Sequence, residues 1–189
     1  KIKKVFFSLK DPDERSYDKS TNQFKRNRIE VKNGILAQDI KNFYKSYFKY
    51  RKKDILPFVT AKIAISKDFY TNNKKKEWIT NTFSRGRVHL MRSYHDCVLT
   101  SVQTIINDNP RFTCRIYGLE DKSPSHIILD KNLKIPIASN MVKSAKKFST
   151  IIFFNKIDQK KINYLKNLRI KLIKTRLNKD GNFDLKNIL

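Results

Sequence analysis

Short apolar segments recur along the chain, and this recurrence constrains the fold more than any other feature. The segments are rich in Ile, Val and Phe, and they are separated by stretches with helical spacing or by polar turns. Alternation of buried strands with helices is typical of an α/β protein with a largely parallel sheet. We expect strands at residues 4–9, 28–32, 54–66, 96–101, 125–130, 149–155 and 169–175.

Apolar side chains at helical spacing predict an amphipathic helix over residues 36–52. Further helices are expected over about 20–28, 82–94 and 160–167, with a helical turn at 102–108 and a helix that begins at Asp184. Thr80 or Asn81 is the expected N-cap of the helix over 82–94. Because Pro57 ends the long amphipathic helix, we place the main boundary near residues 52–56. Two domains, 1–53 and 54–189, follow from this boundary.

The net charge of +25 has two interpretations. It is typical of a nucleic-acid-binding module, and it is also the result expected from an AT-rich genome that favours Lys, Asn and Ile. Lysine is spread along the chain and is not gathered into one stripe. Both interpretations share one consequence, because a positive field favours anionic ligands such as phosphates.

Targeting and cysteine signals point to a cytoplasmic protein. No apolar run approaches the roughly 18 residues that a membrane helix requires, and the first residues do not form a signal peptide. Cys97 and Cys114 stand alone and the three histidines are scattered, so we expect buried, reduced thiols and no metal site. Glycine-rich phosphate loops and hydrolase motifs are also absent from the sequence.

Arginine is rare in this chain but gathers in one window. There are 11 arginines against 31 lysines, and five of the arginines lie within residues 85–115. The planar guanidinium binds phosphate or carboxylate with two hydrogen bonds, which lysine cannot do. The window therefore indicates an anion site, with chance clustering and surface salt bridges as the alternative.

Three other residues admit both a structural and a functional interpretation. Asp108 lies in an Asn-Asp-Asn-Pro turn, where it either caps its own backbone or presents a carboxylate to a pocket. Lys62 lies in a predicted strand among apolar residues, as a ligand contact or as a lysine at the sheet edge. Trp78 is the only tryptophan, and such a residue is more often part of the core than a ligand platform.

Residues 57–136 resemble the reductase domain of the bifunctional riboflavin-biosynthesis deaminase/reductase family. The resemblance is carried by "PFVTAKIAISKD", by "WIT", by "RGRVHLMRSYHDCVLTSVQTIINDNPRFTCR" and by "SPSHIILDKNLKIP". Less specific similarity extends to both ends. Residues 1–16 look like the last strand and turn of the family's deaminase domain, and the helix at 36–52 looks like the interdomain connection.

This resemblance implies an incomplete reductase domain with a dihydrofolate-reductase-like fold, preceded by the last strands and helix of a cytidine-deaminase-like domain. The implied activity is hydride transfer from NADPH to the ribosyl group of 5-amino-6-(5-phospho-ribosylamino)uracil, which becomes ribityl. The family's zinc-binding deaminase motifs and its glycine-containing cofactor segment are not in this sequence. We therefore expect a piece of a longer protein that neither deaminates nor reduces its substrate alone, and the sequence does not decide whether it is a homo-oligomer.

The resemblance also implies roles for individual positions. Lys62 and Asp108 are the candidates for assisting proton transfer. The implied substrate contacts are Lys76, Arg92, Phe112 and Arg115, and the implied cofactor contacts are Ile65, Trp78, Thr104, Asp108 and Lys131. Two positions depart from the family pattern, because Phe69 stands where a glycine is usual and Lys76 stands where a substrate-binding serine is usual.

Two other functions stay open at this level. One is a basic nucleic-acid-binding module, for which a steep salt dependence of DNA affinity is expected. The other is a related reductase-fold enzyme that acts on a different pyrimidine or folate-like substrate. Saturation by NADPH distinguishes both enzymes from the binding module, and only substrate profiling separates the two enzymes from each other.

Overall fold

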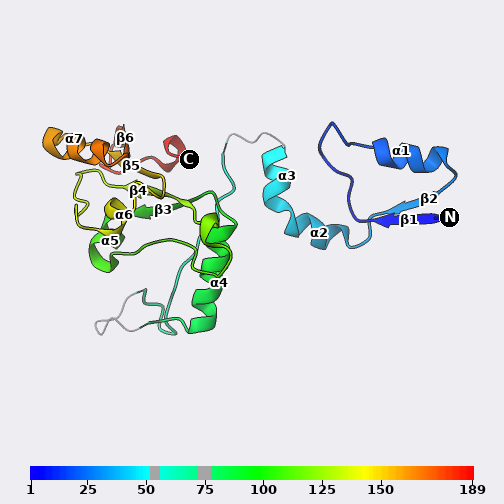
Figure 1. Ribbon diagram of the computed structural model, residues 1–189, viewed down its shortest axis with the longest axis horizontal. Coiled ribbons are helices and arrows are strands. Elements are labelled where there is room, and N and C mark those ends of the chain that lie inside the picture. Colours follow the sequence, from blue (N-terminus) through cyan, green and yellow to red (C-terminus); the bar gives the residue numbers. More distant parts are fainter. Residues whose placement is uncertain (52–55, 72–77) are drawn as a thin grey trace. The chain divides into compact units, whose positions relative to one another are not determined.

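A computed structural model describes residues 1–51, 56–71 and 78–189, and Figure 1 shows its elements. The chain forms two compact units, one of Lys1–Lys62 with Leu189 and the other of Ile63–Ile188. We describe each unit by itself. The predicted boundary at 53/54 lies among residues outside the description and stays a prediction.

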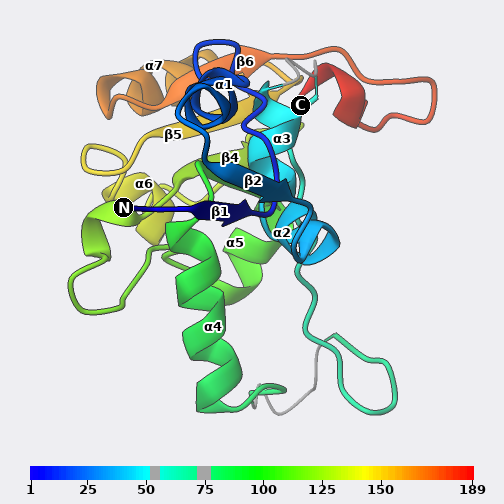
Figure 2. The same cartoon turned by 90° about the vertical axis from the view of Figure 1, so that its right-hand side faces the viewer.

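The first unit contains a pair of parallel strands joined by a helix. Strand β1 (Lys4–Phe7) pairs with β2 (Glu30–Asn33), with Val5 beside Val31, and α1 (Lys19–Arg26) connects them. Figure 2 shows α1 beside this pair. The predicted helix over 36–52 is divided at Tyr44 into α2 (Ala37–Phe43) and α3 (Lys45–Arg51). The division falls in a run of aromatic residues, which have lower helix propensity than Leu or Ala.

A carboxylate is the only buried residue among the described residues of this unit. Asp13 is 6% exposed, its carboxylate accepts a hydrogen bond from Arg15 at 2.7 Å, and it forms an ion pair with Arg51 of α3 at 3.0 Å. Nearby, the Tyr47 hydroxyl of α3 donates to Asp11 at 3.0 Å. The hydrogen bonds from Arg15 are the main reason that the pKa of Asp13 lies far below its usual range. The turn after β1 is thus attached to α3 by polar contacts.

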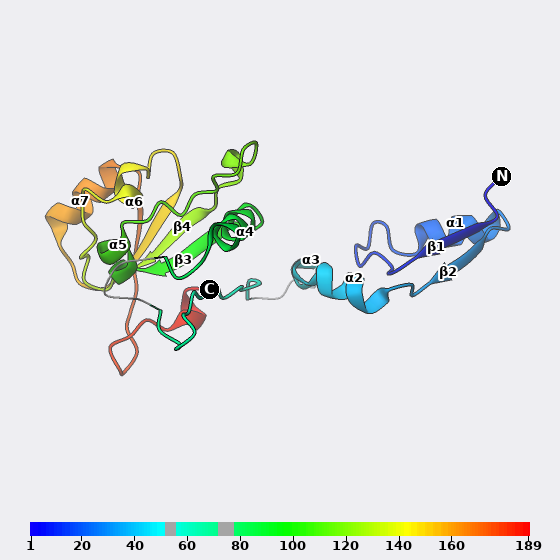
Figure 3. The same cartoon turned by 90° about the horizontal axis from the view of Figure 1, so that it is seen from below.

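The second unit is built on a four-stranded sheet whose strands are all parallel. Its order is β3 (Cys97–Ser101), β4 (Ser125–Leu129), β5 (Thr150–Phe154) and β6 (Lys171–Lys174). The connections contain α5 (Val102–Asp108), η1 (Glu120–Lys122), α6 (Asn140–Lys143) and α7 (Gln159–Asn167). Because each crossover joins neighbouring strands in the same direction, right-handed connections place α5, α6 and α7 on one face. Figure 3 shows α5, α6 and α7 on one side of the strands and α4 (Thr82–Ser93) on the other.

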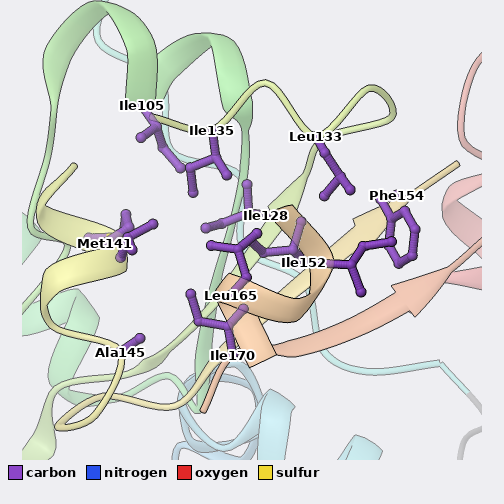
Figure 4. Packing of buried hydrophobic residues seen from close by; sticks show 12 residues of the cluster. Ile105, Ile128, Leu133, Ile135, Met141, Ala145, Ile152, Phe154, Leu165 and Ile170 are labelled. Carbon is purple, nitrogen blue, oxygen red and sulfur yellow. The ribbon is translucent and has the colours of Figure 1, made fainter. Parts of the chain in front are cut away.

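The core of this unit lies between the sheet and those connecting helices. Figure 4 shows Ile128 of β4 and Ile152 of β5 at its centre, and both are fully buried. Leu165 of α7 and Met141 of α6 close over them. The buried carboxylate of Asp130 holds the loop after β4, because its two oxygens accept the backbone N–H groups of Lys134 and Ile135, each at 2.8 Å.

The α/β fold class with a parallel sheet is confirmed, but the predicted strand at 54–66 is wrong for its described part. Residues 56–66 have no regular secondary structure, and Val59 and Ile63 are 61% and 70% exposed. The alternating pattern there is compatible with a strand, but a strand forms only when a neighbour completes its hydrogen bonds. Among the described residues β3 pairs with β4 alone, so its second edge meets no strand.

Two smaller expectations also need correction. The segment that begins at Asp184 is a single 3-10 turn, η2 (Leu185–Asn187), and not the start of an α-helix. Cys114 is buried as expected, but Cys97 is exposed at the start of the edge strand β3. Both thiols are free. No helix among the described residues has the length and apolar character needed to cross a membrane.

Candidate functional site

Helix α4 carries the first part of the arginine window. The Asn81 side chain caps it by accepting the Ser84 N–H at 2.8 Å, so Asn81 is the cap and not Thr80. His89 and Arg92 lie three residues apart and therefore share one face of the helix. Both side chains are partly buried. The helix thus directs an imidazole and a guanidinium toward the same neighbour.

That neighbour is the segment Thr113–Arg115, which runs toward β4. The Thr113 carbonyl accepts a hydrogen bond from Arg92 Nη1 at 3.1 Å, and it also lies 3.0 Å from His89 Nδ1. Arg115 Nη2 lies 3.1 Å from His89 Nε2. The imidazole therefore stands between the two arginines, which are far apart in the sequence.

Phe112 completes this cluster. The Arg92 guanidinium lies over its ring, 5.6 Å from the centroid, and the ring also packs against the apolar core. Phe112 has a φ of 49°, a left-handed conformation that is uncommon for an aromatic residue. The structure thus brings together three of the residues predicted to bind substrate: Arg92, Phe112 and Arg115.

The electrostatics of the cluster are those of an uncompensated cationic site. Among the described residues, neither Arg92 nor Arg115 forms an ion pair with a carboxylate. Burial lowers the pKa of Arg92, and the nearby Arg115 lowers it further. Burial likewise lowers the pKa of His89, with both arginines adding to the effect, so the imidazole is neutral near pH 7. Arg92 is partly buried and Arg115 is exposed. Two neighbouring guanidinium groups without a counter-ion among the described residues favour an anionic ligand with several oxygens.

Trp78 lies at the surface and not in the core, which corrects the expectation for a lone tryptophan. Its side chain is 78% exposed, and the guanidinium of Arg85 lies 4.8 Å from the ring centroid. Arg85 also donates a hydrogen bond to the Thr80 carbonyl. The arginine on the first turns of α4 therefore holds the indole against the helix, with most of the ring open to solvent.

Two predicted cofactor residues lie at the carboxyl ends of neighbouring strands. Thr104 is in the first turn of α5, directly after β3, and its N–H points to the Ser101 hydroxyl at 3.5 Å. Lys131 follows β4, and its ammonium donates to the Gly181 carbonyl at 3.0 Å. Because β3 and β4 are parallel, both residues lie at one edge of the sheet, where α/β proteins commonly bind ligands.

Asp108 is exposed at the end of α5. Within the described part of the chain, its side chain makes no hydrogen bond or ion pair, so the structure does not join it to the arginine cluster. The turn interactions come from Asn109, whose side chain accepts the Asn140 N–H at 2.8 Å and whose carbonyl accepts the Asn140 amide at 2.7 Å. The expectation that Asp108 caps its own backbone is therefore wrong, and its carboxylate is available to a ligand.

The remaining predicted residues lie outside these groups. Ile65 is 44% exposed, in the second unit, whereas Lys62 is exposed at the end of the first unit. Lys76 lies outside the described residues. Phe69 has a φ of 66° and is 81% exposed. The usual glycine is suited to this left-handed turn, which Phe69 adopts against its steric preference.

Sequence reasoning missed His89, and it missed the contact of Arg85, a member of the arginine window, with Trp78. His89 connects Arg92 and Arg115, and Arg85 covers Trp78. The spacing of His89 and Arg92 on a predicted helix was a usable signal. No sequence signal indicated the contact between Arg85 and Trp78, because this contact depends on the path of the backbone just before α4. Among the described residues, no group of three His, Cys, Asp or Glu side chains is arranged to hold a metal ion.

A parallel α/β unit, with a cationic cluster formed by α4 and the segment before β4 and with polar groups after β3 and β4, defines the class of protein: an α/β domain with a candidate ligand-binding site. The family is shown by comparison with known proteins. The model of the RibD C-terminal domain matches residues 57–189, and the chain belongs to this family.

Curated relatives and solved structures agree with this assignment. The chain is 28% identical to the riboflavin biosynthesis protein RibD of Aquifex aeolicus over its whole length, which is 51% of that protein. It is also 28% identical to RibD of Actinobacillus pleuropneumoniae over 91% of the chain and 46% of that protein. The chain thus spans about half the length of these relatives.

A solved structure from Thermotoga maritima, described as a diaminohydroxyphosphoribosylaminopyrimidine deaminase/5-amino-6-(5-phosphoribosylamino)uracil reductase, has 25% identity and a TM-score of 0.65. The match covers 92% of this chain and 54% of the Thermotoga maritima chain. RibD of Acinetobacter baumannii, at 21% identity and a TM-score of 0.67, covers 94% of this chain and 49% of its own, and shows the same fold.

Proposed function

We propose that this chain serves the NADPH-dependent reduction of 5-amino-6-(5-phospho-ribosylamino)uracil to its ribityl form in riboflavin biosynthesis. The observation that carries the proposal is the cluster of Arg92, Phe112 and Arg115, which has two guanidinium groups and no carboxylate among the described residues. Such a cluster suits the phosphate of a phosphorylated sugar. The description of the Thermotoga maritima relative supplies the substrate class.

The chemical groups of the predicted cofactor residues are of types that can bind a nicotinamide cofactor. Trp78 offers an open aromatic face that is fixed by Arg85, and Thr104 and Lys131 offer a hydroxyl and an ammonium at the carboxyl edge of the sheet. Ile65 and Asp108 are the further proposed contacts. When bound, NADPH supplies the hydride. The protein's contribution is to bind both molecules, align them and exclude water.

Proton transfer needs a titratable group near the sugar. Asp108 is exposed and unpaired within the described residues, so its carboxylate is available to accept or donate a proton. Lys62 is the second proposed participant in this role, and Lys76 is a proposed substrate contact. These assignments rest on the family resemblance.

The test of the proposed function is oxidation of NADPH with the phosphorylated ribosylaminopyrimidine, assayed in the full-length gene product that carries these residues. We expect Arg115→Ala to raise KM for this substrate by about tenfold or more, as expected when a charge-assisted hydrogen bond is lost. Arg111→Ala is the matched control, because Arg111 is an exposed neighbour outside the cluster. The proposal fails if no reduced product forms with NADPH, or if another pyrimidine or pterin is reduced and this substrate is not.

Cofactor binding has an independent readout in the fluorescence of Trp78, the only tryptophan of these 189 residues. We expect NADPH to change its fluorescence with saturation, and we expect Arg85→Ala to weaken that response because the indole loses the guanidinium that holds it. Arg87→Ala is the control on the same helix. An unchanged tryptophan signal at saturating NADPH would remove Trp78 from the proposed cofactor site.

A further inference from the structure

His89 lies at the centre of the arginine cluster, and its two ring nitrogens face different groups. Nε2 faces Arg115 Nη2 at 3.1 Å. Nδ1 lies 3.0 Å from the Thr113 carbonyl and 3.2 Å from the backbone N–H of Arg115. A neutral imidazole has one donor and one acceptor nitrogen, so these contacts cannot all be hydrogen bonds at once.

The chemistry of arginine decides between the two tautomers. A guanidinium only donates, so Nε2 must carry a lone pair to bond Arg115 Nη2. Nδ1 then carries the proton and donates it to the Thr113 carbonyl. The opposite tautomer would accept the Arg115 backbone N–H on Nδ1 at 3.2 Å, but it would direct an N–H of the ring at the Arg115 guanidinium and leave the contact to the carbonyl without a proton. The tautomer with the proton on Nδ1 satisfies both of the shorter contacts.

The same carbonyl also holds the second guanidinium. Arg92 Nη1 donates to the Thr113 oxygen at 3.1 Å and lies 3.4 Å from His89 Nδ1. One carbonyl and one neutral imidazole thus orient two positively charged groups that would otherwise repel each other. The charged groups that face His89 are Arg92 from its own helix and Arg115 from the segment before β4.

We propose that His89, neutral and protonated on Nδ1, is a positioning residue that holds Arg92 and Arg115 together as one binding site for the phosphate of the substrate. The proposal rests on the proposed function for the identity of the ligand. The anion-binding geometry itself rests only on the contacts described above. His89 acts through the two arginines and need not touch the substrate.

Two substitutions test this role, with sulfate as the probe because its charge does not change near neutral pH. His89→Gln keeps an acceptor for Arg115 and a donor for Thr113, whereas His89→Leu keeps neither. We expect His89→Leu to weaken sulfate binding about tenfold, equivalent to about 1.4 kcal/mol, and His89→Gln to restore most of the affinity. The matched control is His95→Leu, which removes an imidazole bonded to the Met91 carbonyl.

Nitrogen-15 NMR of the histidine rings checks the tautomer directly. We expect the signal of a protonated Nδ1 and an unprotonated Nε2 for His89 in the wild-type chain near pH 7. In turnover assays we expect His89→Leu to raise KM for the phosphorylated substrate and to leave kcat nearly unchanged, because the lost interaction concerns binding of a remote phosphate.

The outcomes separate this proposal from the proposed function. Wild-type sulfate affinity in His89→Leu, an affinity in His89→Gln as low as in His89→Leu, or a ring protonated on Nε2 would each overturn the role of His89. Absence of NADPH-dependent reduction in the full-length gene product, together with sulfate binding that depends on His89, would refute the reductase and leave the anion site standing.

Discussion

The two units follow the same alternation of strand and helix, but they bury different chemistry. In the second unit, twelve mainly aliphatic residues form one cluster around Ile128 and Ile152. In the described part of the first unit the one buried residue is Asp13. None of the apolar side chains there is buried, and Phe43 and Tyr50 are each 78% exposed. Secondary structure therefore forms in both units, whereas an apolar core forms only in one.

The physical cause of this difference is the presence of a helical layer over the sheet of the second unit. A sheet buries its face only when another layer covers it, and the second unit supplies that layer with α5, α6 and α7. The described part of the first unit has two strands and short helices, and its turn is held by a hydrogen bond from Arg15 to Asp13 and an ion pair between Asp13 and Arg51. Ion pairs and hydrogen bonds around a buried carboxylate contribute less to the stability of a unit than an extended apolar core does, because desolvation of the charges offsets much of their attraction.

The largest expected effect comes from the core of the second unit. We expect Ile128→Ala to lower the free energy of unfolding of that unit by about 2–5 kcal/mol, because it leaves a cavity in a fully buried site. Phe43→Ala removes a larger side chain from the first unit, but its side chain is mostly exposed, so we expect a loss of at most about 0.5 kcal/mol. Urea denaturation followed by circular dichroism measures both, and equal losses would contradict the comparison.

A smaller effect concerns the pH dependence of the second unit. His126 in β4 is 1% exposed, and its Nε2 has no partner among the described residues. Burial, with a lesser effect from Arg92, lowers its pKa to about 4. The unfolded chain, with a pKa near 6.5, binds the proton more readily, so stability falls as the pH drops from about 6.5 to about 4.

The size of this loss is up to about 3 kcal/mol, from the difference of the two pKa values. We expect His126→Leu to flatten the decline, as measured by urea midpoints between pH 7 and 4. His95→Leu serves as the control, since His95 is a half-buried histidine of the same unit. An equally steep decline in His126→Leu would show that other groups cause the acid sensitivity.

The smallest expected effect is local and lies in the first unit. Asp13→Asn removes the charge that attracts Arg15 and Arg51, and we expect faster amide hydrogen exchange in α3 with little change in the second unit. The lowered pKa of Asp13 means that this contribution is present above the usual carboxyl range and is lost as the pH falls through its value in the folded chain. Glu14→Gln, an exposed neighbour, is the control. If amide hydrogen exchange in α3 is unchanged in Asp13→Asn, the Asp13 carboxylate does not hold this unit together.

Most of the fold could be predicted because its elements have strong local signals. The buried strands at 125–129 and 150–154 and the helix capped by Asn81 follow from apolar runs, periodicity and capping chemistry. The segment 56–66 has an equally clear alternation but forms no strand, because pairing is decided by a neighbour and not by the segment itself. The short helix α6 was missed because four residues carry too little periodicity.

The candidate site was predictable in part for a similar reason. Clustering of rare arginines identified Arg92 and Arg115, and the structure joins them through His89. The structure does not place Asp108 with these two arginines, because closeness in sequence does not determine the direction in which a side chain points. Asp108 lies exposed at the end of α5, whereas Arg115 returns to α4.

The sequence by itself determined the alternation of elements, the family and the residue types available for binding an anion. Local propensity and side-chain chemistry suffice for these properties. Only the tertiary structure decided that the imidazole of His89 separates two guanidinium groups, that Trp78 lies outside the core, and that residues 56–66 form no strand. These depend on long-range contacts, whose partners lie far apart in the chain and are selected by packing.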